Sequence, residues 1–246
     1  MSTIDLPEIP APFCFGMLGS RVHRPQLDLS GEPGSEFWDA ATSPEMARQY
    51  RAANRIRFPG PLSLPGWVFC DLFALPGAIG LLLGPAALLE VSTQEALGVS
   101  PDGRAIVAAY YAAPTLTPGM VVGVSLISLV PGKGLGHIVK AHTLAALRAR
   151  VQRGVAQWSN WSLRSHAKIG PMKIIGPVPP GHALQAESFV YEVALGGGGP
   201  STSNVSVDVR DTTGLAQVLD DVAAGVSTHI VPPAFDGARV YLHRSP

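Results

Sequence analysis

The sequence predicts an α+β protein in which a mostly antiparallel, curved or barrel-like β-sheet is combined with one long amphipathic helix. Short apolar segments separated by Pro-Gly, Gly-Pro and Thr-Pro-Gly turn signals occupy both halves of the chain. One glycine-rich turn, at 131–136, leads into the only long stretch with helical periodicity. The hydrophobic content of 46% in 246 residues is enough for a substantial core.

The N-terminal region differs in composition from the rest of the chain. Residues 1–35 are rich in Pro, Gly and Ser and show little periodicity, which predicts an extended arm with little regular structure. Residues 36–246 are expected to form a single α+β domain. Within it, Ser43-Pro44-Glu45 combines an N-cap, a proline at the first helical position and an acidic first-turn residue. We therefore expect a helix from there to Arg55, before Pro59 prevents its continuation.

Strands are expected where apolar, β-branched and aromatic residues cluster between turn signals. These segments are 67–75, 78–83, 87–92, 104–113 and 120–130 in the first half, and 168–178, 183–195, 204–210, 228–231 and 238–244 in the second. A short helix is expected at 214–224. The apolar stretch 72–89 has the length of a membrane span, but Pro76 and Pro85 favour two buried strands joined by turns.

The stretch 131–161 is predicted to contain the long amphipathic helix. At about 100° per residue, six of its side chains fall within a narrow arc. These are Lys140, Leu144, Leu147, Val151, Val155 and Trp158. A lysine therefore lies in line with an apolar stripe.

Lys140 is the main catalytic candidate for this reason. Near the core its ammonium group would lose solvation, and desolvation lowers the pKa of a lysine. A neutral amine is the nucleophile that Schiff-base chemistry on a ketone or aldehyde requires. His137, one turn earlier on the same side, could act as acid or base. Alternatively, the stem of Lys140 lies along apolar surface and releases its charge to water, while His137 caps the helix or faces solvent.

The glycines before the helix are candidates for ligand binding. Gly134 and Gly136, together with Gly132, supply flexible backbone whose N–H groups could hold a carboxylate or phosphate at the helix start, beside Lys133. The pattern matches neither the Walker sequence nor the dinucleotide fingerprint. A simple tight turn is the alternative interpretation.

Two further sets of candidates lie in the second half. Arg164, His166 and Lys168 occupy alternate positions, so on a strand they would share one face and could bind a substrate carboxylate, or equally form a solvated face. Glu187 and Tyr191 are four residues apart and would also share a strand face. There they could supply a carboxylate and a phenol in a barrel interior.

Composition excludes several classes of protein. Lys plus Arg and Asp plus Glu number 18 each, so no net charge recruits nucleic acid or an anionic membrane. The sequence has no GxSxG, no HExxH and no zinc-type Cys/His spacing, so neither a serine hydrolase nor a metal site is expected. Only 15% of residues are charged, which predicts a homo-oligomer that hides apolar surface. The N-terminus lacks the pattern of a signal peptide, which predicts a cytoplasmic protein.

Four segments of the chain resemble the acetoacetate decarboxylase-like superfamily. They are GMVVGVSLISL at 119–129, GHIVKAHTLAAL at 136–147, MKIIGPVPPGHALQAESFVYEV at 172–193 and THIVPPAFDGARVYLHR at 228–244. The resemblance covers roughly the half of the chain from Gly119 onward. It implies a β-rich, cone-like barrel, oligomeric assembly and a desolvated lysine that forms a Schiff base with a keto acid. Lys140 would take that role here.

The leading functional prediction is a small-molecule enzyme of lyase type that needs no cofactor. It would break or make a bond next to a carbonyl through Lys140, with His137 assisting proton transfer. Its substrate is expected to carry a carboxylate or to be hydrophobic. The first alternative is a non-catalytic barrel that binds a hydrophobic or acyl ligand. The second is a cofactor-free isomerase or cyclase that uses Glu187 and Tyr191.

Overall fold

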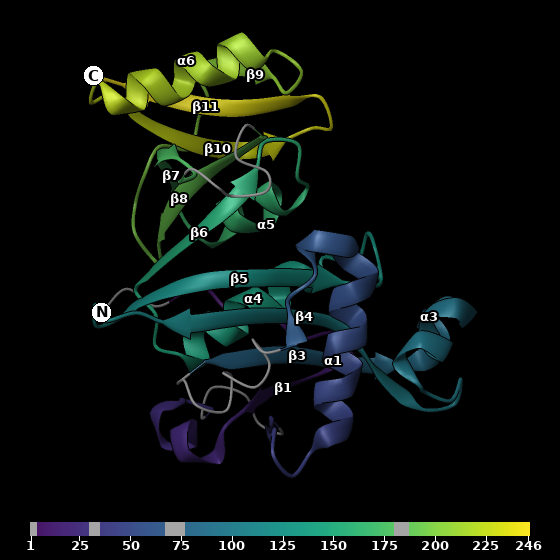
Figure 1. Cartoon of the computed structure of the whole chain (residues 1–246). Coiled ribbons are helices and arrows are strands. Elements are labelled where there is room, and N and C mark those ends of the chain that lie inside the picture. Colours follow the sequence, from purple (N-terminus) through teal and green to yellow (C-terminus); the bar gives the residue numbers. More distant parts are fainter. Residues whose placement is uncertain (1–3, 30–34, 67–76, 180–186) are drawn as a thin grey trace. The chain divides into compact units, whose positions relative to one another are not determined.

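The computed structural model describes residues 4–29, 35–66, 77–179 and 187–246 (Figure 1). The chain divides into two compact units, the first formed by residues 6–149 and the second mainly by residues 150–246. Each unit contains its own series of strands and its own helices, and each is described by itself. In the described part of the chain, no helix is long and apolar enough to cross a membrane.

The first unit is built on a mixed series of strands. These are β1 (Cys14–Gly19), β2 (Glu36–Asp39), β3 (Ala78–Pro85), β4 (Arg104–Pro114) and β5 (Met120–Ser128). Their order is β2-β1-β3-β4-β5. The pair β1/β2 is parallel, and the pairs β1/β3, β3/β4 and β4/β5 are antiparallel. β4 is almost completely buried, as expected for a strand rich in Ala, Val, Ile and Tyr that is covered on both faces.

Helices cover both faces of these strands. The unit contains α1 (Pro44–Arg57), α3 (Val91–Leu97), α4 (Leu135–Ala146) and the 3-10 turns η1 (Arg21–Gln26), η2 (Gly60–Leu62) and η3 (Ala86–Leu88). α1 lies on the face of Ser125, whose hydroxyl is 2.7 Å from the Tyr50 hydroxyl. α4 lies on the opposite face, where Gly136 contacts the neighbouring side chain of Leu126. Because Ser125 and Leu126 are successive strand residues, they point to opposite faces.

The second unit is an antiparallel series of strands. They are β6 (Val151–Gln157), β7 (Met172–Pro177), β8 (Ser188–Ala194), β9 (Val205–Asp208), β10 (Ser227–Phe235) and β11 (Arg239–Ser245), in the order β6-β8-β7-β10-β11-β9. The helices α5 (Ser162–Ile169) and α6 (Thr212–Ala223) complete the unit.

Both helices of the second unit pack on the same face of its strands. The ring of His166 in α5 contacts Tyr191 in β8, and Tyr191 shares a face with Ile174, its register partner in β7. The start of α6 at Gly214 packs on Val207 in β9. The pairings through β11, β10 and β7 place Val207 on the same face as Tyr191. The opposite face of these strands therefore carries neither α5 nor α6.

The predicted fold class is wrong in two respects. First, no single long amphipathic helix exists in the described residues, because α4 ends at Ala146 and residues 151–157 form β6. Arg148, between them, has a φ of 51°, in the left-handed region that ends helices. Second, the described strands do not close into a barrel: β2 and β9 each pair on one side only. The apolar stripe that suggested a long helix is divided between a helix and a strand.

Some of the other predicted elements are confirmed and others are wrong. The helix opening at Ser43-Pro44 is confirmed as α1, and the short helix at 214–224 as α6. The predicted strand at 87–92 is wrong, because these residues form η3 and the start of α3. The predicted strand at 67–75 lies entirely outside the described residues. β1 and η1 form inside residues 1–35, where little regular structure was expected.

Candidate functional site

The turn between β5 and α4 is the most distinctive backbone feature of the first unit. Pro131, Gly132, Lys133 and Gly134 are all exposed, and the helix begins directly after them. Gly132 and Gly134 have φ values of 75° and 70°, which residues with a Cβ rarely adopt. An added Cβ at either glycine would meet nothing within 4 Å. The glycines are therefore required by the backbone path, and the space in front of them is open.

The electrostatic character of this turn is positive. The first N–H groups of a helix lack acceptors within the helix and carry a partial positive charge. The first turn of α4 contains no acidic residue that would neutralise it, and exposed Lys133 adds a full charge. His137, the third residue of the same turn, is half-buried. The predicted pair Gly134 and Gly136 thus lies at the helix start, with Gly134 as the N-cap residue.

The body of α4 is held rigidly behind this turn. Thr143 packs on Gly80 of β3 so closely that an added Cβ on Gly80 would overlap the threonine hydroxyl. That hydroxyl donates to the Val139 carbonyl at 2.6 Å. His142 lies 2.8 Å, through its Nε2, from the Pro7 carbonyl. A firmly seated helix keeps its N-terminal N–H groups in a fixed position.

Lys140 does not lie at a surface where a substrate could approach. Its side chain is fully buried in the middle of α4, so it does not release its charge to water as the alternative interpretation proposed. Burial lowers the pKa of the Lys140 amine well below its usual range. Its Nζ lies 5.7 Å from the centre of the Tyr110 ring. The amine is thus inside the core between α4 and β4, which suits a structural role.

In the second unit the structure joins residues that the sequence placed in two separate sets. The Tyr191 hydroxyl lies 3.1 Å from Nδ1 of His166. It also accepts a hydrogen bond of 2.6 Å from Nε2 of Gln152. All three side chains are buried, and burial raises the pKa of the Tyr191 phenol. The phenol stays protonated and joins Gln152 and His166 in a buried hydrogen-bond network.

The remaining predicted residues of this unit do not join that cluster. Residues 162–169 form a helix, not the strand that was expected, so Arg164, His166 and Lys168 do not share a face. Arg164 and Lys168 are exposed, and His166 points inward. Glu187 is exposed just before β8, whereas Tyr191 is buried. Sequence reasoning missed Gln152, whose signal was its place among the inward-facing small residues of a strand.

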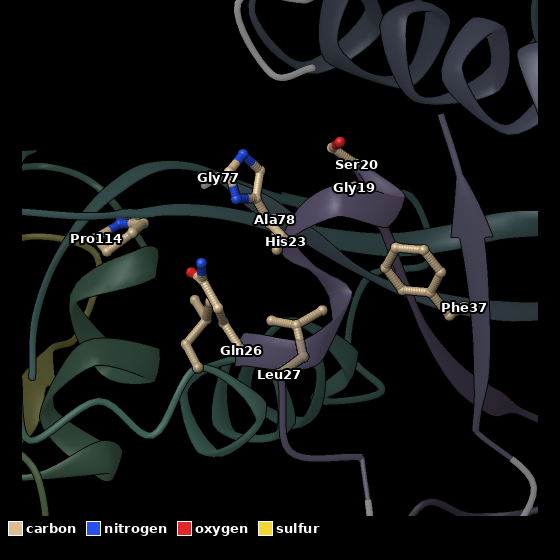
Figure 2. A pocket seen from close by; sticks show the side chains of 10 residues that line it. Gly19, Ser20, His23, Gln26, Leu27, Phe37, Gly77, Ala78 and Pro114 are labelled. Atoms are coloured by element: carbon tan, nitrogen blue, oxygen red, sulfur yellow. The ribbon is translucent and has the colours of Figure 1, made fainter. Parts of the chain in front are cut away.

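A small cavity in the first unit lies away from the glycine turn (Figure 2). Its lining includes Ser20, His23, Gln26, Phe37 and Leu147. Leu147 is the C-cap of α4, so the cavity is at the end of the helix opposite the turn, about 18 Å away for twelve residues. Its space of about 70 Å³ corresponds to two or so water molecules.

The described ranges contain no set of side chains suited to bind a metal ion. No group of three or more His, Cys, Asp or Glu side chains there is placed to hold a metal ion. Cys14 of β1 is a free cysteine, and its Sγ accepts a hydrogen bond from the Arg104 guanidinium.

Comparison with known proteins gives matches among solved structures only. No family model and no curated protein matches the chain. An aminoglycoside 6'-acetyltransferase type Ii has 12% identity and a TM-score of 0.43 over 65% of this chain and 95% of its own. The NatC complex bound to Gag peptide and CoA has 10% identity and a TM-score of 0.45, over 64% and 95%. The aminoglycoside 6'-N-acetyltransferase from Enterococcus faecium has 10% identity and a TM-score of 0.42 over 65% of this chain and 96% of its own.

These structures correct the family and the chemistry expected from the sequence. Two of them are named as acetyltransferases and the third is a complex bound to CoA, so the predicted acetoacetate decarboxylase-like family and its lyase reaction are wrong. The buried position of Lys140 agrees with this correction, because a Schiff base forms only where a carbonyl substrate reaches the amine. At these TM-scores the similarity assigns no activity to the chain.

Proposed function

We propose that this chain is an acyltransferase that takes its acyl group from a coenzyme A thioester. The phosphate groups of the thioester would lie against residues 131–134 and the first turn of α4. The observation that carries the proposal is the exposed turn with two left-handed glycines, which leads directly into a firmly packed helix. This arrangement is typical of backbone sites for phosphate groups.

Charge supports the same ligand class. Lys133 is exposed within the turn, and the first turn of α4 is free of acidic residues. A diphosphate such as that of coenzyme A carries negative charge that this end of the helix would stabilise. The open space before Gly132 and Gly134 lets a phosphate approach the backbone closely.

The reaction class is the part that experiment must decide. In such a transfer an amine or hydroxyl of the acceptor attacks the thioester carbonyl, the carbon–sulfur bond breaks, and coenzyme A leaves as a thiol after taking up a proton. Two of the structures compared above are named as acetyltransferases and the third is bound to CoA, so acetyl-coenzyme A is the donor to be tested.

The binding test uses a matched pair of substitutions at the helix start. Asp and Asn both tolerate a positive φ, so Gly134→Asp and Gly134→Asn should keep the turn, while only the former adds negative charge. We expect wild-type protein to bind acetyl-coenzyme A in isothermal titration calorimetry. Gly134→Asp should weaken binding about tenfold or more, and Gly134→Asn should change it much less. Equal effects of the two substitutions, or no binding by the wild type, would refute the site.

The transfer test measures release of free thiol from acetyl-coenzyme A in the presence of a panel of primary amines. Wild-type protein should accelerate thiol release with at least one amine, and Gly134→Asp should not. Binding without any acceptor-dependent thiol release would leave a coenzyme A-binding protein and reject the acyltransferase assignment.

A further inference from the structure

The helix-free face of the second unit carries a row of basic side chains. Lys173 in β7 is the register partner of His229 in β10, and His229 is the register partner of His243 in β11. Side chains of directly paired residues lie on one face, with their Cβ atoms about 5 Å apart. Lys173, His229 and His243, which we call the basic row, are therefore side by side on three adjacent strands.

The basic row faces away from the helices of the unit. Ile230 follows His229 and pairs with Met172, on the face covered by α5 and α6. Residues one position along a strand point to the other face. Lys173 is exposed, and His229 and His243 are half-buried. The row is thus accessible from solvent on the face opposite α5 and α6.

In the described residues, the carboxylates near the basic row contact other side chains and neutralise its charge only weakly. Glu192 in β8 is the register partner of Lys173, but its carboxylate already accepts a 2.8 Å hydrogen bond from Arg153 in β6. Tyr241, two residues from His243 on the same face of β11, donates its hydroxyl to Asp236. The Arg153–Glu192 pair has no net charge, so an excess of positive charge remains on the row.

The close placement of the three basic side chains destabilises the protein when no ligand is bound. Like charges directly opposite one another destabilise a sheet. Burial, followed by the charges of Lys173 and His243, lowers the pKa of His229. Nδ1 of His229 is buried and has no hydrogen-bond partner in the described part of the chain. A bound anion would relieve the repulsion between these side chains.

We infer that the basic row is a second anion site, which binds a phosphate or diphosphate group of a small molecule between Lys173, His229 and His243. Adjacent strands are about 4.8 Å apart, so one diphosphate group can contact all three side chains. The site is independent of the glycine turn and of the proposed acyl transfer. It stands on the register of β7, β10 and β11 alone.

Binding at this site must be coupled to protonation. A dianion next to His229 favours the charged imidazolium and offsets the repulsion from Lys173 and His243. The complex therefore takes up a proton that the free protein lacks at neutral pH. By linkage, the affinity for the anion rises as pH falls through the region where His229 titrates.

The experiment titrates inorganic pyrophosphate into the full chain at pH 6 and pH 8 by isothermal titration calorimetry. It uses the Gly134→Asp background, in which any binding of pyrophosphate at the glycine turn should be weakened about tenfold or more. Two buffers of different ionisation enthalpy give the number of protons taken up on binding. We expect affinity at least about fivefold higher at pH 6, with net proton uptake at pH 7.

Variants assign the effect to the row. Lys173→Met should weaken binding about tenfold at both pH values, and His229→Gln should remove most of the pH dependence. Lys168→Met, which removes an exposed charge from α5, is the control and should change neither. If His229→Gln is unfolded by circular dichroism, His243→Gln replaces it. No binding in the Gly134→Asp background, absence of proton uptake, or an equal loss in Lys168→Met would overturn the inference.

Discussion

Replacement of Lys140 by methionine should stabilise the protein at neutral pH. The lysine side chain is fully buried, and burial lowers the pKa of its amine well below the usual range. Methionine has a similar length and flexibility but no charge to desolvate. The attraction between an ammonium group and the Tyr110 ring, 5.7 Å away, amounts to about 0.5–2 kcal/mol. Desolvation of a buried ion costs several kcal/mol and therefore dominates.

The size of the effect follows from proton linkage. The unfolded lysine titrates near 10.4, and each pH unit below that value corresponds to about 1.4 kcal/mol. At pH 7 the loss of the proton on folding thus costs up to about 4.6 kcal/mol. Imperfect packing of the new side chain costs about 1.5 kcal/mol or less. Lys140→Met should therefore raise the free energy of unfolding at pH 7, by no more than about 4.6 kcal/mol.

The pH dependence gives the stricter test. Between the lowered pKa of the folded state and about 10.4, the unfolded state binds one more proton than the folded state, so wild-type stability rises with pH. The slope from this residue is at most about 1.4 kcal/mol per pH unit, and Lys140→Met should lack it. Urea denaturation at pH 7, 8 and 9 measures both slopes, with Lys168→Met as the exposed control. Identical slopes in wild type and Lys140→Met would show that the buried amine keeps its proton.

Three other substitutions test the packing described above, each by urea denaturation. Gly80→Ala places a methyl group against the Thr143 hydroxyl and should cost about 1–3 kcal/mol; the added change Thr143→Ala should recover part of this loss, and no recovery would contradict the assigned clash. Tyr191→Phe removes the acceptor of the Gln152 amide and should cost about 1–3 kcal/mol, whereas a neutral effect would mean that the network is dispensable. Asp211→Ala removes the cap that accepts from the Gly214 N–H and should cost about 1 kcal/mol, with Asp211→Asn as the conservative control.

Local signals in the sequence were sufficient for several elements. Ser43-Pro44 correctly predicted the start of α1, because a proline is favoured at the first helical position and needs no distant partner; the Ser43 side chain makes no cap hydrogen bond. β3, β4 and β5 were predicted from apolar runs bounded by turn residues. The glycines at 132 and 134 were recognised as a turn before a helix, since a positive φ is a property of single residues.

Residues 131–161 show where local patterns fail. The apolar positions from Lys140 to Trp158 fit the helical period, yet Val151–Gln157 form β6. Buried and exposed residues also alternate along this segment, as they do in a strand, with Gln152, Gly154 and Ala156 facing inward. All seven residues of β6 pair with residues of β8. This pairing depends on a segment more than thirty positions away in the chain. Helical periodicity alone could not reveal this partner.

The sequence by itself determined the glycine turn, the start of α1 and the position of most strands, because each depends on interactions within a few residues. Only the tertiary structure decided that Lys140 is buried against Tyr110, that His166 meets Tyr191, and that Lys173, His229 and His243 lie in one row. These outcomes depend on strand register and helix packing between segments distant in sequence. A shift of register by one residue would turn each side chain to the other face, so no local pattern fixes them.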